Sequence, residues 1–293
     1  HSRSLGSLTP VGALAFGQWR FTDDDRGTGR RLLETALDAG MNQIDTADVY
    51  GCDWGGTGFG QVEEILGRIL ADAPGLRDRM VLATKGGIAP PTPYDSSPKY
   101  LRAACEASLR RLQTDVIDLY LIHRPDMFTH PADVAITLNA LRAEGKIREV
   151  GVSNHTPAQV AALQAHLEFP IVANQPEFSA AVLDPMRDGT LDQCMEVRIV
   201  PMAWSPLAGG RLATGDGIRP ELLAVLDELA TREGVDRAQL ALAFVLAHPS
   251  APIAIVGSQN EDRIRSSTAA LGVTLDRADV YAIVQASEGV PLP

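Results

Sequence analysis

Residues 44–51, IDTADVYG, place two carboxylates and a phenol close together, directly after an apolar run. Asp45, Asp48 and Tyr50 are the side chains here that could do acid–base chemistry. A polar turn after a strand explains them equally well when the stretch is taken alone, because turns favour Asp and Gly. A phenol has a pKa near ~10 and is a poor acid at neutral pH unless a cation lies close to its hydroxyl. The stretch therefore gains meaning only if a cation converges on it.

Two candidate partners also follow apolar runs: Lys85 ends LATK, and His123 ends LYLIH. A lysine ammonium beside the Tyr50 hydroxyl would make the phenolate more accessible, and Asp45 would hold that ammonium in place. Neutral His123 would donate a hydrogen bond to a substrate oxygen. Such a group is a proton donor aimed at a developing alkoxide, which suits reduction of a carbonyl. No side chain supplies a hydride, so a nicotinamide cofactor is implied.

Strands and helices alternate along the chain and must position these groups. Short apolar runs predict eight strands, at residues 12–17, 42–45, 80–85, 116–123, 148–153, 171–175, 199–205 and 252–257. Helical patterns lie between them, for example at 30–40, 97–112, 130–146, 156–167 and 219–234. Eight such units in 293 residues predict a (β/α)8 TIM barrel, an α/β fold with one domain over residues 1–293. In a barrel, the carboxyl ends of the strands meet, so Asp45, Lys85 and His123 should converge.

A doubly wound open sheet is the alternative fold. The first predicted strand is not followed by a G-x-G-x-x-G turn, which argues against that sheet. The glycine-rich GGTGFG at 55–60 follows a loop and not a strand, so it is discounted as a nucleotide fingerprint. Helical patterns at 236–247 and 276–288 exceed eight simple units. We therefore expect extra helices near the C-terminus.

Composition and charge disfavour several classes of partner. The net charge of −11 disfavours nucleic acid. No apolar run approaches the ~20 residues that span a bilayer, so no membrane partner is expected. Cys52, Cys105 and Cys194 are widely spaced and odd in number, which fits free thiols and neither a disulfide framework nor a zinc site. The N-terminus lacks the apolar segment of a secretory signal, and we expect a cytoplasmic protein with no metal.

Several motifs in order make nearly the whole chain resemble the aldo-keto reductase superfamily. They are GQWR, DTADVYG, ATKGG, LIHRPD, GKIREVGVSNHTPAQV, NQPEF, MAWSPLAGGRL and IVGSQNEDRI, and the branch that the chain resembles most is the bacterial one that carries LIHRPD. The resemblance implies a barrel closed underneath by an N-terminal β-hairpin, which residues 7–17 would supply. It also implies NADPH-dependent reduction of aldehydes and ketones, with Tyr50 as general acid. The family's catalytic tetrad matches Asp45, Tyr50, Lys85 and His123.

The same resemblance implies a cofactor bound across the barrel mouth. Ser153, Asn154 and Gln175 match the positions that hold the nicotinamide carboxamide. Trp204 stands where the family usually stacks a tyrosine on the ring. The other matches lie in the first loop, the pyrophosphate loop and the adenosine site, and they are Gly17, Gln18, Trp19, Ser205, Pro206, Leu207, Gly209, Arg211, Gly257, Ser258, Asn260, Arg263 and Ser267. The lysine that many members aim at the 2′-phosphate is absent, but Arg263 suits phosphate, so NADPH is favoured while NADH or dual use stays open.

Trp19, Trp54 and His123 are the candidates for contact with a small-molecule carbonyl substrate. The loop at 52–60 is glycine-rich, and its Trp54 would either close over substrate or pack the loop down. Two other functions stay open. One is a nicotinamide-binding regulatory subunit with little turnover, and the other is a phosphate-sugar isomerase barrel that needs no dinucleotide. The particular aldehyde or ketone and the oligomeric state do not follow from the sequence.

Overall fold

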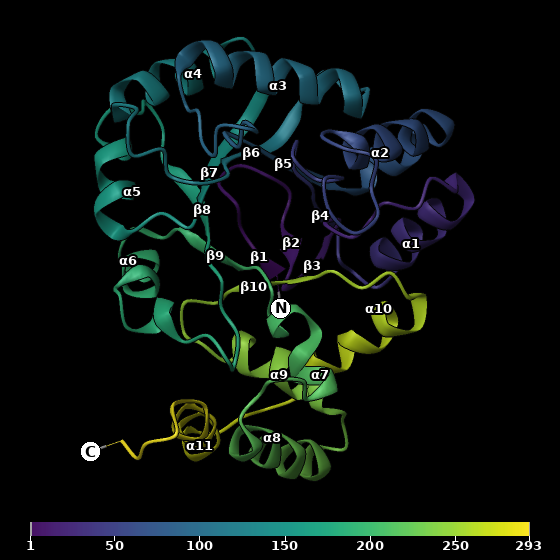
Figure 1. Cartoon of the computed structure of the whole chain (residues 1–293), viewed down its shortest axis with the longest axis vertical. Helices are drawn as coiled ribbons and strands as arrows, with labels where there is room; N and C mark the ends of the chain where they lie inside the picture. The colour runs from purple at the N-terminus through teal and green to yellow at the C-terminus, as the bar shows by residue number, and fades with distance from the viewer. Residues whose placement is uncertain (1, 293) are drawn as a thin grey trace.

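Eight strands of the described chain close into a parallel barrel. The computed structural model describes residues 2–292. Its barrel strands are β3 (Leu14–Gly17), β4 (Gln43–Asp45), β5 (Val81–Gly86), β6 (Ile117–Ile122), β7 (Ile147–Ser153), β8 (Ile171–Gln175), β9 (Val200–Ala203) and β10 (Ile253–Val256). Around the ring the order is β10-β3-β4-β5-β6-β7-β8-β9, and neighbouring strands are parallel (Figure 1). The predicted barrel is confirmed, and the open doubly wound sheet is wrong because the ring is closed.

Helices cover the outside of the barrel. They are α1 (Arg26–Asp38), α2 (Gln61–Asp72), α3 (Pro98–Leu112), α4 (Pro131–Ala143), α5 (Pro157–Gln164), α6 (Thr190–Val197), α7 (Arg211–Thr214), α9 (Arg237–Leu246) and α10 (Glu261–Ser267), with 3-10 turns η1 (Pro74–Arg79), η2 (Asp184–Met186), η3 (Ala208–Gly210) and η4 (Thr268–Gly272). Local signals start several of them: the Ser97 hydroxyl accepts a hydrogen bond from the Tyr100 amide, and Thr156 forms a capping box with Gln159. Within residues 2–292, no helix has both the length and the hydropathy to cross a bilayer.

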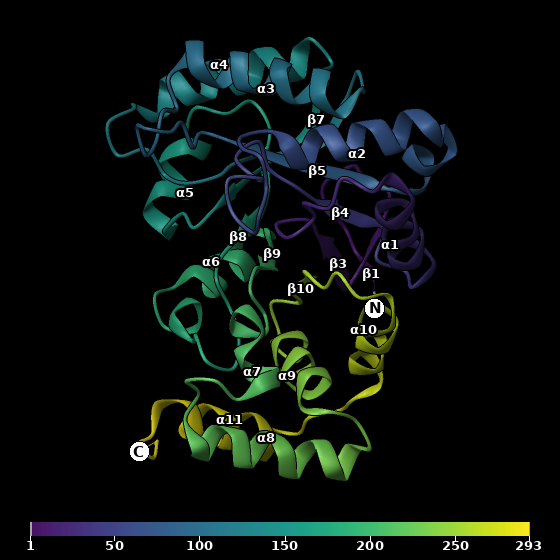
Figure 2. The same cartoon turned by 45° about the vertical axis from the view of Figure 1, so that its right-hand side comes forward.

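Two helices, α8 (Pro220–Glu233) and α11 (Arg277–Glu288), run side by side outside the ring (Figures 1 and 2). The Arg232 guanidinium donates to both carboxylate oxygens of Asp279, at 2.8 and 2.6 Å, and so joins the two helices. The two additional helices predicted at 236–247 and 276–288 are present as α9 and α11. They do not pack together outside the barrel, because α11 packs against α8. Helix α9 is instead buried against β10, because it is apolar on nearly every face.

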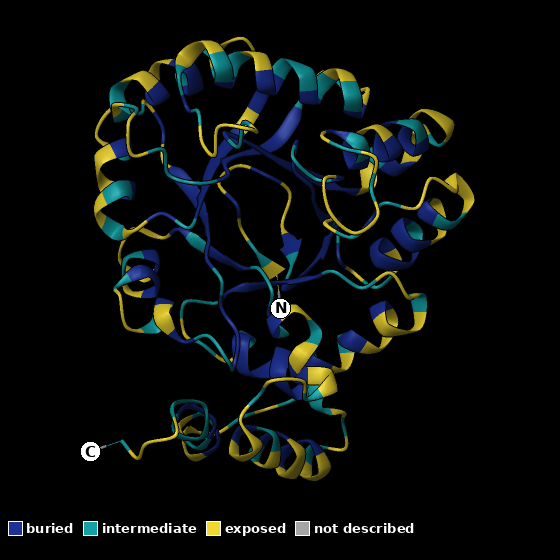
Figure 3. Cartoon of the chain, in the orientation of Figure 1, coloured by how far each residue is buried: buried dark blue, intermediate teal, exposed yellow. Residues whose placement is uncertain are grey.

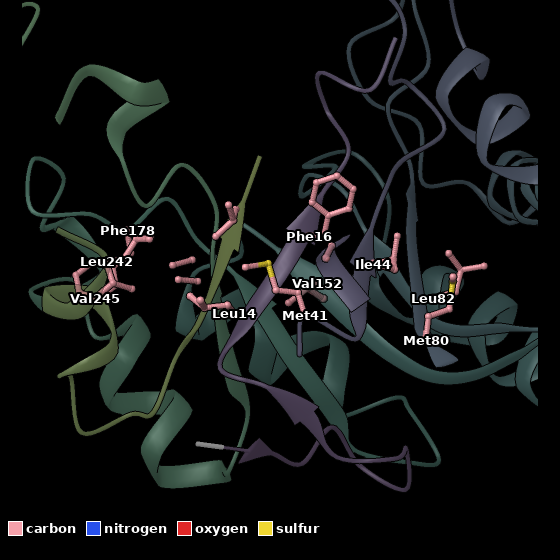
Figure 4. Packing of buried hydrophobic residues seen from close by; sticks show 14 of the residues in the cluster. Leu14, Phe16, Met41, Ile44, Met80, Leu82, Val152, Phe178, Leu242 and Val245 are labelled. Carbon is pink, nitrogen blue, oxygen red and sulfur yellow. The ribbon is translucent and has the colours of Figure 1, made fainter. Parts of the chain in front are cut away.

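Side chains of each barrel strand alternate between the interior of the barrel and the helices. Phe16, Ile44 and Leu82 belong to the large cluster that packs between the strands and the helices (Figure 4). Their neighbours Ala15 and Ala83 belong to a second, smaller cluster inside the barrel. The strands are buried on both faces, and the exposed residues lie mainly on the outer helices and loops (Figure 3). This alternation decides which residues at a strand end point into the mouth.

A short antiparallel hairpin closes the amino-terminal end of the barrel. It consists of β1 (Ser2–Arg3) and β2 (Val11–Gly12). Leu5, Leu8 and Val11 are buried and belong to the cluster inside the barrel, so the hairpin seals that cluster. The predicted hairpin is confirmed, but its bounds of 7–17 are wrong. Residues 14–17 form β3, whose backbone pairs with β10 and β4 in the barrel.

Candidate active site

Three of the four tetrad candidates lie at the carboxyl ends of adjacent strands. Asp45 is the last residue of β4 and pairs with Ala83 of β5. Lys85 lies two residues further along β5 and pairs with Leu121 of β6. His123 follows β6, and its amide donates to the Gly86 carbonyl at 2.8 Å. Because side chains alternate, Asp45, Lys85 and His123 share the inward face with the residues of the inner cluster.

Lys85 is the centre of the group. Its Nζ donates hydrogen bonds to Asp45 Oδ2 at 2.6 Å, to the Thr46 carbonyl at 2.8 Å and to the Tyr50 hydroxyl at 3.0 Å. The three N–H groups of an ammonium are therefore all used. The Tyr50 oxygen accepts from Lys85, which leaves the Tyr50 proton free to be donated elsewhere. Lys85 is fully buried and Asp45 is 2% exposed, so the pair is shielded from water.

The turn after β4 holds Tyr50 in place. The Thr46 amide donates to the Ala83 carbonyl at 2.9 Å, the Asp48 amide to the Lys85 carbonyl at 3.1 Å, and the Tyr50 amide to the Ala47 carbonyl at 3.2 Å. The Asp48 side chain, in contrast to its backbone amide, makes no hydrogen bond to the tetrad within the described residues. Both of its carboxylate oxygens are buried without a partner among residues 2–292, and burial raises the pKa of Asp48 well above its ordinary value.

The pKa of Tyr50 is raised, because burial outweighs the charge of Lys85, which lowers it. The net shift is thus opposite to the expected fall, although the charge of Lys85 limits the rise. Burial lowers the pKa of Lys85, but the charges and hydrogen bonds of Asp45 and Tyr50 together raise it above its ordinary value. At neutral pH the site thus holds a protonated phenol beside an ammonium.

His123 packs against the phenol and stays neutral. The two ring centroids are 5.9 Å apart, with an interplanar angle of 78°. Burial, followed by the charges of Lys85 and Arg124, holds the pKa of His123 well below its ordinary value. His123 Nδ1 is buried without a hydrogen-bond partner among the described residues. A neutral imidazole keeps one N–H donor, which is what positioning a carbonyl oxygen requires, since that oxygen only accepts hydrogen bonds.

The residues matched to the carboxamide form one hydrogen-bonded chain. The Trp204 indole N–H donates to Asn154 Oδ1 at 3.0 Å, and Asn154 Nδ2 donates to the Ser153 hydroxyl at 2.8 Å. That hydroxyl donates to the backbone carbonyl of Gln175 at 2.9 Å. Gln175 Nε2 in turn donates to Asp45 Oδ1 at 2.9 Å. Hydrogen bonds therefore connect the residues matched to the carboxamide site to Asp45 of the tetrad. The sequence motifs do not indicate this link.

Two indoles stand together at the mouth. The rings of Trp19 and Trp54 meet edge to face, with centroids 5.6 Å apart, and the Trp54 carbonyl accepts a hydrogen bond from Thr22. The Arg20 guanidinium lies 4.2 Å from the Trp54 ring centroid and donates to the Gly209 carbonyl at 2.8 Å. Arg20 thus joins three loops of the mouth. Its position directly after Trp19 in GQWR is the sequence signal for it.

A second unassigned cation, Arg124, also lies near the tetrad. Its guanidinium is 5.5 Å from the Trp204 ring centroid, and it makes no hydrogen bond or ion pair with the rest of residues 2–292. Its positive charge limits the rise in the pKa of Tyr50 and adds to the fall in the pKa of His123. The sequence signal for it is its place after His123 in LIHRPD.

The loop after β9 has an irregular backbone with several positive φ angles. Ser205 and Ala208 have positive φ angles of 48° and 49°, and Gly209 has 72°. A Cβ on Gly209 would meet no atom within 4 Å, so this backbone is open to approach by a ligand. Pro206 is buried, and Leu207 accepts backbone hydrogen bonds from Gly210 and Leu212. The Arg211 guanidinium donates to the Ala208 carbonyl at 3.0 Å.

The adenosine candidates gather at α10. Asn260 caps this helix and accepts a hydrogen bond from the Arg263 amide at 3.0 Å. The exposed Arg263 guanidinium has no hydrogen bond or ion pair with other described residues, although the acidic Glu261 and Asp262 precede it. Gly257 and Ser258 lead into the helix. Ser267 is buried, and its hydroxyl donates to the Ile264 carbonyl at 2.7 Å, so it is already engaged.

The first loop completes the set. Gly17 pairs with Asp45, and a Cβ there would lie 2.6 Å from the Ile255 side chain. The Gln18 amide donates to the Asp45 carbonyl at 2.9 Å. Both side-chain amide atoms of Gln18 are buried without a partner among residues 2–292. Unpaired buried amide atoms are costly, so a polar ligand group at this point would stabilise the loop.

Comparison with known proteins gives matches along nearly the whole chain. The sequence model described as the Aldo/keto reductase family matches residues 13–288. The chain is 47% identical to the 6-dehydroglucose reductase of Novosphingobium aromaticivorans, over 99% of this chain and 97% of that protein. It is 37% identical to the 6-dehydroglucose reductase of Agrobacterium fabrum, over 94% of this chain and 93% of that protein.

A solved structure is similar over the whole length. It is an aldo/keto reductase from Klebsiella pneumoniae in complex with NADP and acetate. The two structures agree with a TM-score of 0.79 at 30% identity, and the match covers 99% of this chain and 95% of that one.

Proposed function

Because the chain belongs to the aldo/keto reductase family, and is therefore an oxidoreductase, we propose that it reduces an aldehyde or ketone to an alcohol with NADPH, as one domain over residues 1–293, with Tyr50 as proton donor. The observation that supports this most directly is the hydrogen bond from Lys85 Nζ to the Tyr50 hydroxyl. Because the Tyr50 oxygen accepts this bond, the phenol proton points away from the ammonium and toward a substrate oxygen held beside His123.

The proposed mechanism uses each tetrad member at a stated atom. Neutral His123 donates a hydrogen bond to the substrate carbonyl oxygen and holds it beside the Tyr50 hydroxyl. A reduced nicotinamide held at the mouth by Ser153, Asn154 and Gln175 would supply the hydride for this chemistry. As negative charge develops on the oxygen, Tyr50 gives up its proton, and the Lys85 ammonium stabilises the resulting phenolate. Asp45 keeps Lys85 charged and in place.

The residues at the mouth suit a nicotinamide nucleotide. A carboxamide needs both donors and acceptors, and Ser153, Asn154 and Gln175 offer both. Trp204 would stack on the ring, the open backbone around Gly209 would approach the pyrophosphate, and the Arg263 guanidinium would meet the 2′-phosphate. The NADP in the Klebsiella protein supports the same cofactor here. We therefore propose NADPH over NADH.

A hydroxylated aldehyde such as 6-dehydroglucose is the proposed substrate. Two relatives are named for that reduction, at 47% and 37% identity. The mouth supplies matching chemistry: the Trp19 and Trp54 rings are 40% and 51% exposed and offer apolar faces to a sugar ring. The guanidinium of Arg124 offers donors to hydroxyl oxygens. We also propose a cytoplasmic location, which the free thiols of the described chain support.

The test is NADPH consumption over matched carbonyl compounds. We expect turnover with 6-dehydroglucose and glyceraldehyde that exceeds turnover with propanal, which lacks hydroxyls. Tight NADPH binding without consumption of NADPH on any compound would instead favour the regulatory-subunit alternative, which the names of the relatives do not support. The isomerase barrel, the other alternative, does not fit a chain of this family.

A further inference from the structure

We propose that Gln175 is a positioning residue that links the nicotinamide carboxamide to the proton donor. Its side-chain nitrogen donates a hydrogen bond to Asp45, and its side-chain oxygen accepts one from the carboxamide N–H. This inference rests on the proposed function. It goes beyond it because it makes the state of the tetrad depend on a residue from the opposite side of the barrel.

The hydrogen bond from Gln175 to Asp45 crosses the barrel. Asp45 ends β4 and Gln175 ends β8, and in the ring order these strands are four steps apart in either direction. The bond of 2.9 Å joins residues 130 positions apart in the sequence. Both residues are 2% exposed. A buried polar bond of this kind fixes the two side chains relative to each other more strongly than an exposed one.

Asp45 is held by a different donor at each oxygen. Lys85 Nζ donates to Oδ2 at 2.6 Å, and Gln175 Nε2 donates to Oδ1 at 2.9 Å. With both oxygens engaged, the carboxylate cannot rotate without breaking a buried hydrogen bond. Since Lys85 also donates to the Tyr50 hydroxyl, the position of Asp45 is passed on to the proton donor.

The orientation of the Gln175 amide follows from chemistry. An ionised carboxylate only accepts hydrogen bonds, so the NH₂ end of Gln175 must face Asp45. Its Oε1 accepts no hydrogen bond within residues 2–292, and this oxygen is not completely buried. Oε1 is thus an available acceptor. The Ser153 hydroxyl donates instead to the backbone carbonyl of Gln175, at 2.9 Å. A carboxamide N–H is the complementary donor.

Gln175→Glu gives a pH signature that a purely cofactor-binding role lacks. Two carboxylates in buried contact share one proton, so the pair binds that proton more tightly than an isolated carboxylate. The introduced carboxyl group, when protonated, can donate to Asp45 as the amide does, whereas its ionised form repels Asp45. We expect kcat of Gln175→Glu to approach that of the native enzyme at low pH and to fall at least ~10-fold by pH 8. Native kcat should change little over that range.

A readout in the cofactor-free protein separates positioning from cofactor contact. Tyrosine labelled with ¹³C at Cζ reports the state of each phenol, and Tyr50→Phe assigns the Tyr50 signal. We expect Gln175→Met to shift that signal, because Asp45 loses a donor. Ser153→Ala is the matched control: it should weaken NADP⁺ binding, measured as a smaller thermal shift, but leave the Tyr50 signal in place.

A cofactor analogue tests the other end of the amide. The 3-acetylpyridine analogue of NADP⁺ has a methyl ketone in place of the carboxamide and therefore lacks the N–H donors. We expect the native protein to bind it ~10-fold more weakly than NADP⁺, and Gln175→Met to lose most of this difference. An equal preference in both proteins would contradict the carboxamide contact.

The outcomes distinguish this inference from the proposed function. If the enzyme consumes NADPH with an aldehyde, but the Tyr50 signal of Gln175→Met matches the native signal and Gln175→Glu has the native pH profile, only the inference is overturned. If no carbonyl compound is reduced, the proposed function fails instead. Should Gln175→Met not fold, Gln175→Glu carries the test, since its low-pH state retains the hydrogen bond.

Discussion

Lys85 Nζ donates one hydrogen bond to the Tyr50 hydroxyl at 3.0 Å and a second to Asp45 at 2.6 Å. An ammonium with no N–H left over is a fixed charge, and the phenol beside it has one defined direction in which to release its proton. The chemistry proposed above depends on this arrangement, and the stability of the barrel mouth depends on it as well.

The buried pair of Lys85 and Asp45 makes a prediction about stability. Lys85→Met leaves the Asp45 carboxylate buried without its cation, so we expect the free energy of unfolding to fall by about 3–5 kcal/mol. Adding Asp45→Asn removes that charge, and the double variant should recover part of the loss. Urea denaturation of the native protein, both single variants and the double variant measures the coupling. Additive losses would show that the two groups do not stabilise each other.

His155 predicts a loss of stability in acid. Burial lowers the pKa of His155 from 6.5 to about 4. Because the folded chain releases this proton more readily than the unfolded chain, the contribution to stability is complete above pH 6.5 and is lost as the pH falls toward 4. The loss at pH 4 should be about 3 kcal/mol.

The control for this prediction is His155→Gln, which keeps a donor for the Ser153 carbonyl that His155 contacts at 2.9 Å but does not titrate. Its free energy of unfolding should fall less than that of the native chain between pH 6.5 and pH 4. Parallel curves for the two proteins would place the acid sensitivity elsewhere.

The exposed guanidinium of Arg263 leads us to predict a preference for NADPH over NADH. Its exposed guanidinium is free of partners within residues 2–292, so Arg263→Ala should raise KM for NADPH by roughly 10-fold through loss of a charge-assisted bond to the 2′-phosphate. KM for NADH, which lacks this phosphate, should stay the same. Arg265→Ala is the matched control on the same helix, because the Arg265 guanidinium already pairs with Glu261 at 2.9 Å. An equal change in KM for NADPH and for NADH would show that Arg263 does not bind the 2′-phosphate.

The position of Trp54 at the barrel mouth leads us to predict a role in substrate selectivity. Its ring is half exposed beside Trp19, so Trp54→Ala should raise KM for 6-dehydroglucose several-fold by removing an apolar face. KM for NADPH should not change. Phe59→Ala is the control in the same loop, because the Phe59 ring packs against the Arg111 guanidinium, 5.7 Å from its centroid, and not against an indole. If both variants behave alike, the effect belongs to the loop and not to the indole.

The barrel and the tetrad can be predicted because both depend on local patterns. Alternation along a strand places residues such as Lys85 and Leu121 on the same inward face, and a closed parallel ring brings strand ends together. The hairpin bounds are missed because two-residue strands such as Ser2–Arg3 carry almost no pattern. The outlying place of α8 is missed because amphipathic patterns do not say which partner a helix will meet.

The parts of the site that cannot be predicted are long-range. Nothing local in the sequence connects Gln175 to Asp45, since the bond exists only when β4 and β8 face each other across a closed ring. Arg20 and its contact with Gly209 likewise depend on where two loops settle. Motifs alone imply a cation beside Tyr50 and hence a lower pKa, but they do not give the extent of burial, which raises that pKa.

The most direct test of the central claim is steady-state NADPH oxidation by Tyr50→Phe with 6-dehydroglucose as substrate. That variant keeps the ring beside His123 and Lys85 and removes only the hydroxyl. We predict that kcat falls by at least ~10²-fold while NADPH still raises the melting temperature as in the native protein. Native-like kcat in Tyr50→Phe would contradict the assignment of Tyr50 as the proton donor.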